Sequence, residues 1–405
     1  MREGSGKLVA VNVSGPGESP AAVAKEGVGL NERLSVRIVK ALPGFTLDIE
    51  WSAGDGTAVL FGPSGSGKTL TLQCLAGLVR PDGGRIIVNG RTVFDAAIGV
   101  QVPPQARRLG YVFQGYALFP HLTVAQNIAF GLHRYPRAAR AERTREVVER
   151  LGLTAFAARY PRELSGGQQQ RAALGRALAP DPELILLDEP LSALDLPLRR
   201  QLRDDLGSIL RDWGKAAVLV THDLSEAFQL ADTVVVYDGG RVIQCALKSE
   251  LLRQPASEAV ARVIGIRNIL HGALVKATPE SVQVLWRGQI LEAVNQTASF
   301  DLAEPRPRVA FCIRPEYVRL IRKDRPAPDT EHHMSVMSGT VIREADAGSV
   351  WTLHFRLSQP GPPAQRDYDL EIEVPNLTYE LLDIRRDRDW RVAIHRGSIQ
   401  ILPSS

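Results

Sequence analysis

The sequence has few cysteines, few aromatic residues and no long apolar run. Three cysteines occur in 405 residues, and Cys74, Cys245 and Cys312 lie far apart in the chain. This usage suits a reducing compartment better than a disulfide framework. No apolar run approaches the roughly 20 residues that a membrane-spanning helix needs. The apolar stretch 8–11 is too short for a signal peptide, because Asn12 interrupts it. We therefore expect a cytoplasmic protein.

An excess of one charge is also missing. The formal net charge is only +4, so the composition lacks the excess of basic residues that is typical of nucleic-acid-binding proteins. We therefore expect no nucleic-acid partner. Apolar residues make up 44% and charged residues 23% of the chain, as in ordinary soluble proteins. A chain of 405 residues is long enough for a complete α/β core with a further domain.

The sequence does contain a phosphate-binding pattern. The apolar segment 57–61 before it predicts a buried strand, and the segment 70–77 after it predicts a helix that ends at a glycine. Backbone N–H groups of such a loop, together with the positive end of the helix, bind phosphates. Lys68 can reach the β- and γ-phosphates, and the Thr69 hydroxyl can ligate Mg²⁺. The pattern that predicts this nucleoside triphosphate site consists of Gly62, Pro63, Ser64, Gly65, Ser66, Gly67, Lys68 and Thr69.

A second helix start and an acidic strand end follow further along the chain. Ser165 predicts the N-cap of a helix, and the two glycines after it leave the first turn bare for a second phosphate contact. The apolar run 184–187 leads into Asp188 and Glu189. It predicts a parallel strand that is buried on both faces and delivers two carboxylates at its C-terminal edge. A later apolar strand ends at His222.

These motifs together resemble the ATP-binding subunit of an ABC transporter over roughly residues 34–250. Six motifs occur in the family's order, and six in order at family-like spacing identify the chain as a member of this family. They are the Walker A loop, the Q-loop, the signature, Walker B with its acid pair, the D-loop and the switch histidine. Outside Walker A and Walker B the motif residues are Gln114 in the Q-loop, Leu164, Ser165, Gly166, Gly167 and Gln168 in the signature, Asp195 in the D-loop, and His222.

The chemistry of ATP hydrolysis assigns roles to these side chains. Phosphoryl transfer to water needs charge neutralisation and a group that orients or deprotonates the water. Asp188 is placed to support a Mg²⁺ ion that Thr69 holds, and Glu189 is the candidate general base. The resemblance implies that His222 contacts the γ-phosphate and that Gln114 senses the metal and the water.

The resemblance also implies partners. In this family two subunits form a homodimer in which the signature of one closes the ATP site of the other, with Asp195 near the shared interface. Separate membrane permease subunits would contact the surface near Gln114, and a periplasmic or extracellular protein would bind the substrate. The chain would then be peripheral on the inner face of the cell membrane. Members of the family usually stack adenine on an aromatic residue upstream of Walker A. Phe45 is a candidate, although it lies close to the loop and a core role stays open.

The last third of the chain changes to short strands. Two segments, 269–316 and 336–395, look alike, since both begin with a glycine-containing strand and end with an Arg-Val-Ala strand. This repeat predicts a duplicated small β-barrel of the oligonucleotide-binding type. No aromatic platform or basic stripe for nucleic acid accompanies it. The region resembles the TOBE domain of importer ATPases, which export ATPases generally lack, and the segment 312–316 is typical of it.

We therefore expect an α/β fold, namely an ABC-type P-loop nucleotide-binding domain with a helical subdomain, followed by an all-β, OB-like TOBE/MOP barrel domain. The expected organisation is a flexible extension (1–33), an ATPase domain (34–265) with a helical subdomain at about 115–180, and a duplicated regulatory barrel domain (266–405).

The transported substrate is harder to predict from this chain. The stretches 42–48 and 89–121 resemble the molybdate branch, and Arg267 with Asn268 resembles the start of molybdate-binding barrels, although any such barrel could carry this pair. We expect an ATPase that energises molybdate or tungstate uptake. Importers of sulfate, ferric iron, polyamine or sugar stay open as alternatives. A non-transport ABC ATPase acting on nucleic acid or ribosomes is disfavoured by the importer-type barrel and by the absence of a second nucleotide-binding half.

Overall fold

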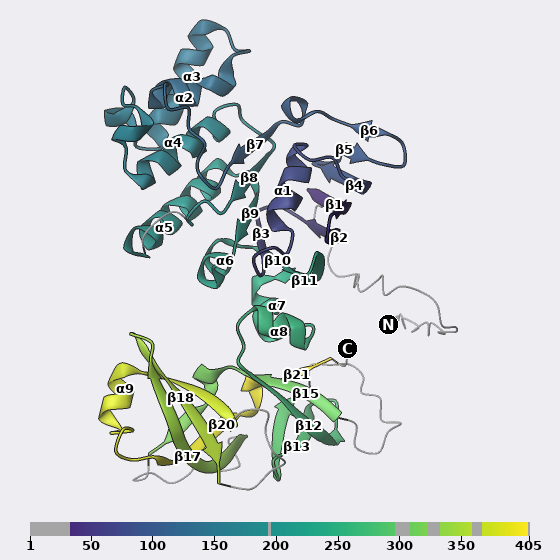
Figure 1. Cartoon of the computed structure of the whole chain (residues 1–405), viewed down its shortest axis with the longest axis vertical. Coiled ribbons are helices and arrows are strands. Elements are labelled where there is room, and N and C mark those ends of the chain that lie inside the picture. Colours follow the sequence, from purple (N-terminus) through teal and green to yellow (C-terminus); the bar gives the residue numbers. More distant parts are fainter. Residues whose placement is uncertain (1–32, 193–195, 296–307, 323–332, 359–366, 404–405) are drawn as a thin grey trace, which may run out of the picture.

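The chain forms two groups of elements that lie one above the other along its longest axis (Figure 1). The larger group begins at β1 and ends at α8, and the smaller one holds the strands from β12 to the C-terminus. The computed structural model describes residues 33–192, 196–295, 308–322, 333–358 and 367–403. Two of the sequence predictions concern residues outside these ranges. They are the D-loop role of Asp195 and the N-terminal extension, of which residues 1–32 are not described.

A six-stranded sheet forms the centre of the larger group. Four of its five pairs of neighbouring strands are parallel, and the pair at one edge is antiparallel. The strand that carries the acid pair lies inside this sheet and is parallel to both neighbours, as its apolar run predicts. In spatial order the strands are β11 (Arg241–Leu247), β10 (Thr233–Asp238), β3 (Thr57–Phe61), β9 (Ala216–Thr221), β8 (Leu184–Asp188) and β7 (Leu109–Val112).

Helices cover this sheet and connect its strands. None of the helices in the described ranges combines the length and apolar character needed to cross a bilayer. Three of them, α2, α3 and α4, are inserted between β7 and β8 and pack on one another. The helices of the larger group are α1 (Lys68–Ala76), α2 (Val124–Ala129), α3 (Arg137–Arg150), α4 (Gly166–Leu178), α5 (Leu196–Trp213), α6 (Leu224–Leu230), α7 (Lys248–Arg253) and α8 (Glu258–Val263).

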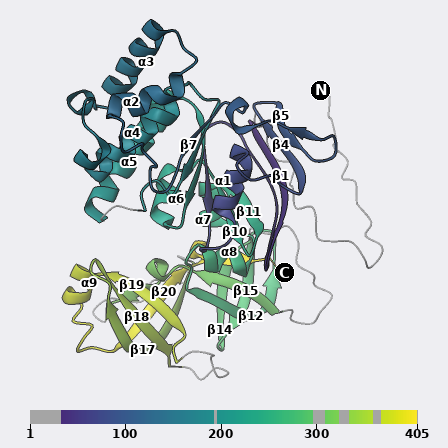
Figure 2. The same cartoon turned by 45° about the horizontal axis from the view of Figure 1, so that its top comes forward.

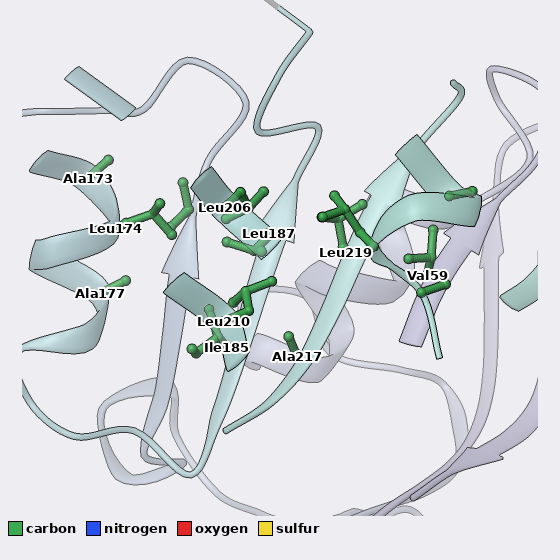
Figure 3. Packing of buried hydrophobic residues seen from close by; sticks show 14 of the residues in the cluster. Val59, Ala173, Leu174, Ala177, Ile185, Leu187, Leu206, Leu210, Ala217 and Leu219 are labelled. Carbon is green, nitrogen blue, oxygen red and sulfur yellow. The ribbon is translucent and has the colours of Figure 1, made fainter. Parts of the chain in front are cut away.

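Both faces of the sheet are buried, which explains why its strands are apolar at consecutive positions. Successive side chains of a strand point to opposite faces. On β8, Ile185 and Leu187 belong to the core formed with α4 and α5, whereas Leu184 and Leu186 belong to the core on the α1 side. Figure 3 shows the first of these cores, with Leu206 and Leu210 of α5 next to Leu187 and Ile185 of β8. Each fully buried leucine contributes about 1.5–3 kcal/mol of transfer free energy.

An antiparallel sheet lies against the α1 side of the central sheet (Figure 2). Residues 34–42 and 45–53 pair in register from end to end, which confirms the antiparallel pair that the alternation of apolar and polar residues predicts. Ile38, Ile49 and Ile86 of this sheet are fully buried in one core with Leu72 of α1. In spatial order its strands are β2 (Phe45–Ala53), β1 (Leu34–Leu42), β4 (Gly83–Val88), β5 (Arg91–Asp95) and β6 (Val100–Gln101).

The smaller group contains two five-stranded antiparallel sheets, as an OB-like, all-β region requires. The structure adds a feature that the repeat pattern does not predict. The short strand that follows each repeat, 319–321 or 399–402, pairs with the sheet of the other repeat. One sheet is β14 (Gln289–Val294), β13 (Ser281–Trp286), β12 (Asn268–Ala277), β15 (Arg308–Ile313) and β21 (Ile399–Leu402). The other is β16 (Arg319–Ile321), β20 (Asp389–His395), β17 (Met334–Asp346), β18 (Val350–Leu357) and β19 (Leu370–Pro375), with α9 (Asn376–Leu381) after β19.

Candidate active site

The phosphate-loop motif forms a tight connection between β3 and α1. Gly67 has a φ of 102°, and a Cβ atom there would lie 2.5 Å from Leu47 Cδ1 and 3.2 Å from Phe45 Cζ. Gly62 has a φ of 155°, and its Cβ would lie 2.3 Å from the carbonyl oxygen of Tyr237. Only glycine tolerates both the left-handed backbone and the close approach. The ring of Phe45, our candidate for adenine stacking, therefore lies directly beside the loop.

Lys68, the first residue of α1, is held under the loop. Its ammonium group donates to the carbonyl oxygens of Gly62 (2.8 Å) and Pro63 (2.7 Å) and lies 3.3 Å from the Ser66 hydroxyl. The side chain is only 5% exposed. Burial lowers the pKa of Lys68, and the negative charges of Glu189 and Asp188 oppose this shift. The charge that could neutralise phosphate oxygens is thus prepositioned among the backbone groups of the loop.

Asp188 ends β8 and is bonded on both of its carboxylate oxygens. The Thr69 hydroxyl donates to Oδ1 (2.9 Å), and the Tyr111 hydroxyl donates to Oδ2 (3.1 Å). Burial raises the pKa of Asp188, while the two hydroxyl donors and Lys68 act in the opposite direction and favour the carboxylate. Burial also raises the pKa of Tyr111, and Asp188 adds to the effect, so this phenol stays protonated and donates.

Glu189 follows in a backbone conformation that is unusual for this residue type. Its φ is +44°, in the left-handed region, where a non-glycine residue is strained. Its carboxylate contacts two side chains that follow the neighbouring strands β7 and β9. The Gln114 side-chain amide donates to Oε2 (2.9 Å), and Nδ1 of His222 lies 3.2 Å from Oε1. The candidate base, the Q-loop glutamine and the switch histidine are therefore in direct contact.

The loop that carries His222 is fixed by a small polar network. Thr221 donates its hydroxyl to the buried carboxylate of Glu226 (2.6 Å) and accepts from the backbone N–H of Asp223 (3.0 Å). Asp223 caps α6, because its carboxylate accepts from the backbone N–H groups of Ser225 and Glu226. Burial raises the pKa of Glu226. These contacts hold the histidine at the end of β9, beside Glu189.

The signature segment is not part of this cluster. Ser165 caps α4 as predicted, since its hydroxyl accepts from the backbone N–H of Gln168 and the Gln168 side chain accepts from the N–H of Ser165. The helix packs on β7, α2 and α3 (Figure 1). Leu164 and Gly167 are buried, and Ser165 is exposed at the helix start. The structure therefore joins the other described motif residues in one cluster and leaves the signature as a separate, exposed helix start.

The residues present fit a Mg²⁺ ion that is bound together with nucleotide. Thr69 and Asp188 present oxygen atoms 2.9 Å apart beside the phosphate loop, and Mg²⁺ prefers oxygen ligands. Within the described part of the chain, no three His, Cys, Asp or Glu side chains cluster in a way that could hold a metal. An ion at Thr69 and Asp188 would therefore depend on phosphate and water oxygens for its remaining ligands, as Mg²⁺ commonly does.

A groove of about 380 Å³ lies beside the loop and connects it with the chain that leads to the smaller group. Arg262 of α8 at its edge is paired with Glu258 (2.8 Å), and Glu258 is also 2.8 Å from Nε2 of His271 on β12. One carboxylate thus links the edge of the groove to the first strand of the smaller group. The groove is lined by Phe61, Gly62, Pro63, His222, Arg262 and Val263.

The sequence analysis missed Tyr111 as a site residue. Its hydroxyl touches Asp188 although the two residues are 77 positions apart in the chain. A tyrosine in an otherwise apolar strand three residues before Gln114 is the only local signal. That signal becomes informative once β7 is known to be the neighbour of β8.

Parts of this chain are similar in sequence to known proteins. The family model described as ABC transporter matches residues 47–192. A molybdenum import ATP-binding protein of Rhodospirillum rubrum is 40% identical over 291 residues, which cover 68% of this chain and 79% of that protein. A sulfate/thiosulfate import ATP-binding protein of Chromobacterium violaceum is 48% identical over 60% of this chain and 66% of its own length. A spermidine/putrescine import ATP-binding protein of Oleidesulfovibrio alaskensis is 38% identical, covering 76% and 80%.

Proposed function

Because this chain belongs to the ATP-binding proteins of ABC importers, which are ATPases, we propose that it hydrolyses ATP to drive the uptake of molybdate or tungstate through separate permease subunits. The contact of Glu189 with both Gln114 and His222, next to the Thr69–Asp188 pair, carries the catalytic part of this proposal. The substrate part is supported by similarity to molybdenum and molybdate/tungstate import proteins, one of them 43% identical over 96% of its length.

In the proposed reaction, the protein orients the phosphates and activates a water molecule. Lys68 and the loop N–H groups neutralise and hold the phosphate oxygens. Glu189 accepts the proton of the attacking water, and Gln114 and His222 hold its carboxylate in place. A Mg²⁺ ion held by Thr69 and supported by Asp188 would supply charge neutralisation at the phosphates. The 20% exposure of the Glu189 side chain leaves room for water to reach it.

We also propose that two copies of this chain form the complete site. Of the signature residues, Ser165 is exposed at the start of α4, and the segment lies outside the cluster around Lys68. A helix start with free N–H groups is suited to phosphate, and a second copy could bring it to the loop. The proposed permease contact is the surface that follows Gln114, where Asn127 makes four hydrogen bonds to residues 119–123 and gives this loop a defined shape. In this proposal the subunit lies at the inner face of the membrane.

A second candidate function is import of sulfate or of a polyamine. The relatives described as sulfate/thiosulfate and spermidine/putrescine import proteins match this chain about as well as the molybdenum import protein does. The ATPase site would be the same in each case, because the relatives share the nucleotide-binding part of the chain.

Uptake measurements in cells separate these candidates. Cells would carry the wild type or Glu189→Gln as the only copy, with Arg108→Met, an exposed residue remote from the acid pair, as the control. Molybdenum, tungsten, iron and sulfur contents and labelled spermidine uptake would be compared at limiting supply. Selective loss of molybdenum or tungsten in the Glu189→Gln cells supports the proposal. Selective loss of sulfur or spermidine assigns the second candidate, and loss of iron alone or of none of these overturns both.

A further inference from the structure

We propose that Tyr111 is a positioning residue that orients the Asp188 carboxylate toward the nucleotide-bound metal ion, an inference that rests on the proposed ATPase function. The Tyr111 hydroxyl bonds Oδ2 of Asp188 (3.1 Å) while the Thr69 hydroxyl bonds Oδ1 (2.9 Å). A carboxylate that is held by only one oxygen can rotate about its Cβ–Cγ bond. With one donor on each oxygen, its plane is fixed.

The backbone explains how Tyr111 reaches this acid. β7 and β8 are parallel neighbours, and Tyr111 lies opposite Leu186, two residues before Asp188. Leu186 and Asp188 share a face of β8, so a long side chain from Tyr111 that leans along the strand direction ends beside the carboxylate. A shorter polar residue at position 111 would not span this distance. The site therefore depends on the length of the phenol.

The ring of Tyr111 is itself supported. It packs on the Phe113 ring with centroids 4.3 Å apart and an interplanar angle of 37°. Phe113 is followed by Gln114, whose amide bonds Glu189. One short segment of chain, residues 111–114, thus holds both members of the acid pair. Contacts of this kind, made by residues that do not themselves touch a metal, commonly set ligand orientation and metal affinity.

This arrangement separates metal binding from nucleotide binding. Lys68 and the loop N–H groups hold phosphate, and none of them bonds Tyr111 in the described contacts. Removing the phenol hydroxyl frees Oδ2 without altering the loop. The affinity for Mg²⁺ in the presence of ATP should fall, whereas the affinity for ATP without the metal should be kept.

The test compares Tyr111→Phe with wild-type full-length protein. Tyr368→Phe is the matched control, since it also removes a part-buried phenol hydroxyl that donates to a carboxylate, here Glu371 (2.7 Å) in the smaller group. ATP binding is measured by fluorescence titration in EDTA and again over a Mg²⁺ series, and the Mg²⁺ dependence of hydrolysis is recorded in parallel. Loss of a hydrogen bond to a charged group predicts a rise of about tenfold in the Mg²⁺ midpoint of Tyr111→Phe in both assays.

The expected result is this shift together with ATP affinity in EDTA within about twofold of wild type, and an unshifted midpoint in Tyr368→Phe. An unchanged midpoint in Tyr111→Phe, or an equal loss of ATP affinity in EDTA, overturns the inference. If Tyr111→Phe folds poorly, Phe113→Leu keeps the hydroxyl but removes its ring support, and must shift the midpoint in the same direction. Absence of hydrolysis by the wild type would instead refute the proposed function.

Discussion

Replacing Arg107 with methionine should loosen the C-terminal end of α1, the helix that begins with Lys68. The Arg107 side chain is 1% exposed. Its guanidinium donates to the carbonyl oxygens of Cys74 (2.8 Å) and Leu75 (2.7 Å), in the last turn of α1, and to that of Val102 (2.8 Å). A positive charge at this end also complements the helix dipole.

The magnitude follows from what the substitution leaves behind. Methionine fills most of the space but cannot donate. The carbonyl oxygens of Leu75 and Val102 then lose the guanidinium donor, whereas that of Cys74 keeps the backbone N–H of Gly77 (3.1 Å). A buried group left without a partner costs about 1–3 kcal/mol. Removal of a buried charge recovers part of this cost, and burial indeed lowers the pKa of Arg107. We expect a net loss of about 3 kcal/mol. For a domain of 150–250 residues this corresponds to a drop in Tm of about 6–12 °C.

The assay is thermal unfolding of the full-length protein. The Tm is taken from the unfolding transition that moves to higher temperature when ATP is added, because a ligand stabilises the part of the protein that binds it. Arg108→Met is the control, since Arg108 is exposed and its pair with Glu183 contributes at most about 1 kcal/mol. Arg107→Lys keeps the charge with a different donor geometry and should fall between the two. A Tm for Arg107→Met equal to that of Arg108→Met would refute this account of the helix end.

Three further predictions concern the site itself. Lys68→Ala should abolish tight ATP binding, because the prepositioned charge is lost, and retained hydrolysis would show that the loop is misassigned. Glu189→Gln should bind ATP but hydrolyse it at least about 100-fold more slowly and accumulate as a dimer in size-exclusion chromatography with ATP; a monomer turning over normally would exclude Glu189 as the base. Glu226→Gln tests the buried acid, because burial raises the pKa of Glu226 above its ordinary value of 4.5. The stability that this carboxyl group contributes to the wild type is therefore complete below pH 4.5 and is lost as the pH rises through the raised pKa. The Tm of Glu226→Gln relative to wild type should therefore increase from pH 4.5 to pH 8, and a pH-independent difference would contradict it.

Several features of the site were predictable because they depend on short stretches of chain. A strand, a glycine loop and a helix start occur within residues 57–76, and the helix begins at Lys68 as the pattern requires. Ser165 caps its helix because a hydroxyl at that position satisfies free N–H groups of the first turn. The acid pair follows four apolar residues and stands at the end of an interior strand. In each case the physical cause is local.

Other features depend on which strands are neighbours, and a single sequence does not reveal this. Gln114 and Glu189 are 75 residues apart, and they meet because β7 and β8 lie side by side. The bond from Tyr111 to Asp188 has the same origin. Periodicity predicts that these strands exist and which faces are apolar, but the order of strands in a sheet is decided by long-range packing. Side-chain contacts across two strands therefore escaped prediction, although every residue involved was visible.

The exchanged strands of the smaller group show the same limit at the scale of a domain. Each repeat ends with a short turn of three residues, 315–317 or 396–398, followed by a strand that pairs with the other repeat's sheet. The repeat pattern, 269–316 and 336–395, stops before these strands, so it predicts neither the strands nor their partners. Phe311 of the first repeat and Phe355 of the second are fully buried in one shared core. Neither repeat can therefore complete its sheet or its core alone, because the edge strand of each sheet follows the other repeat in the chain and the core contains side chains of both.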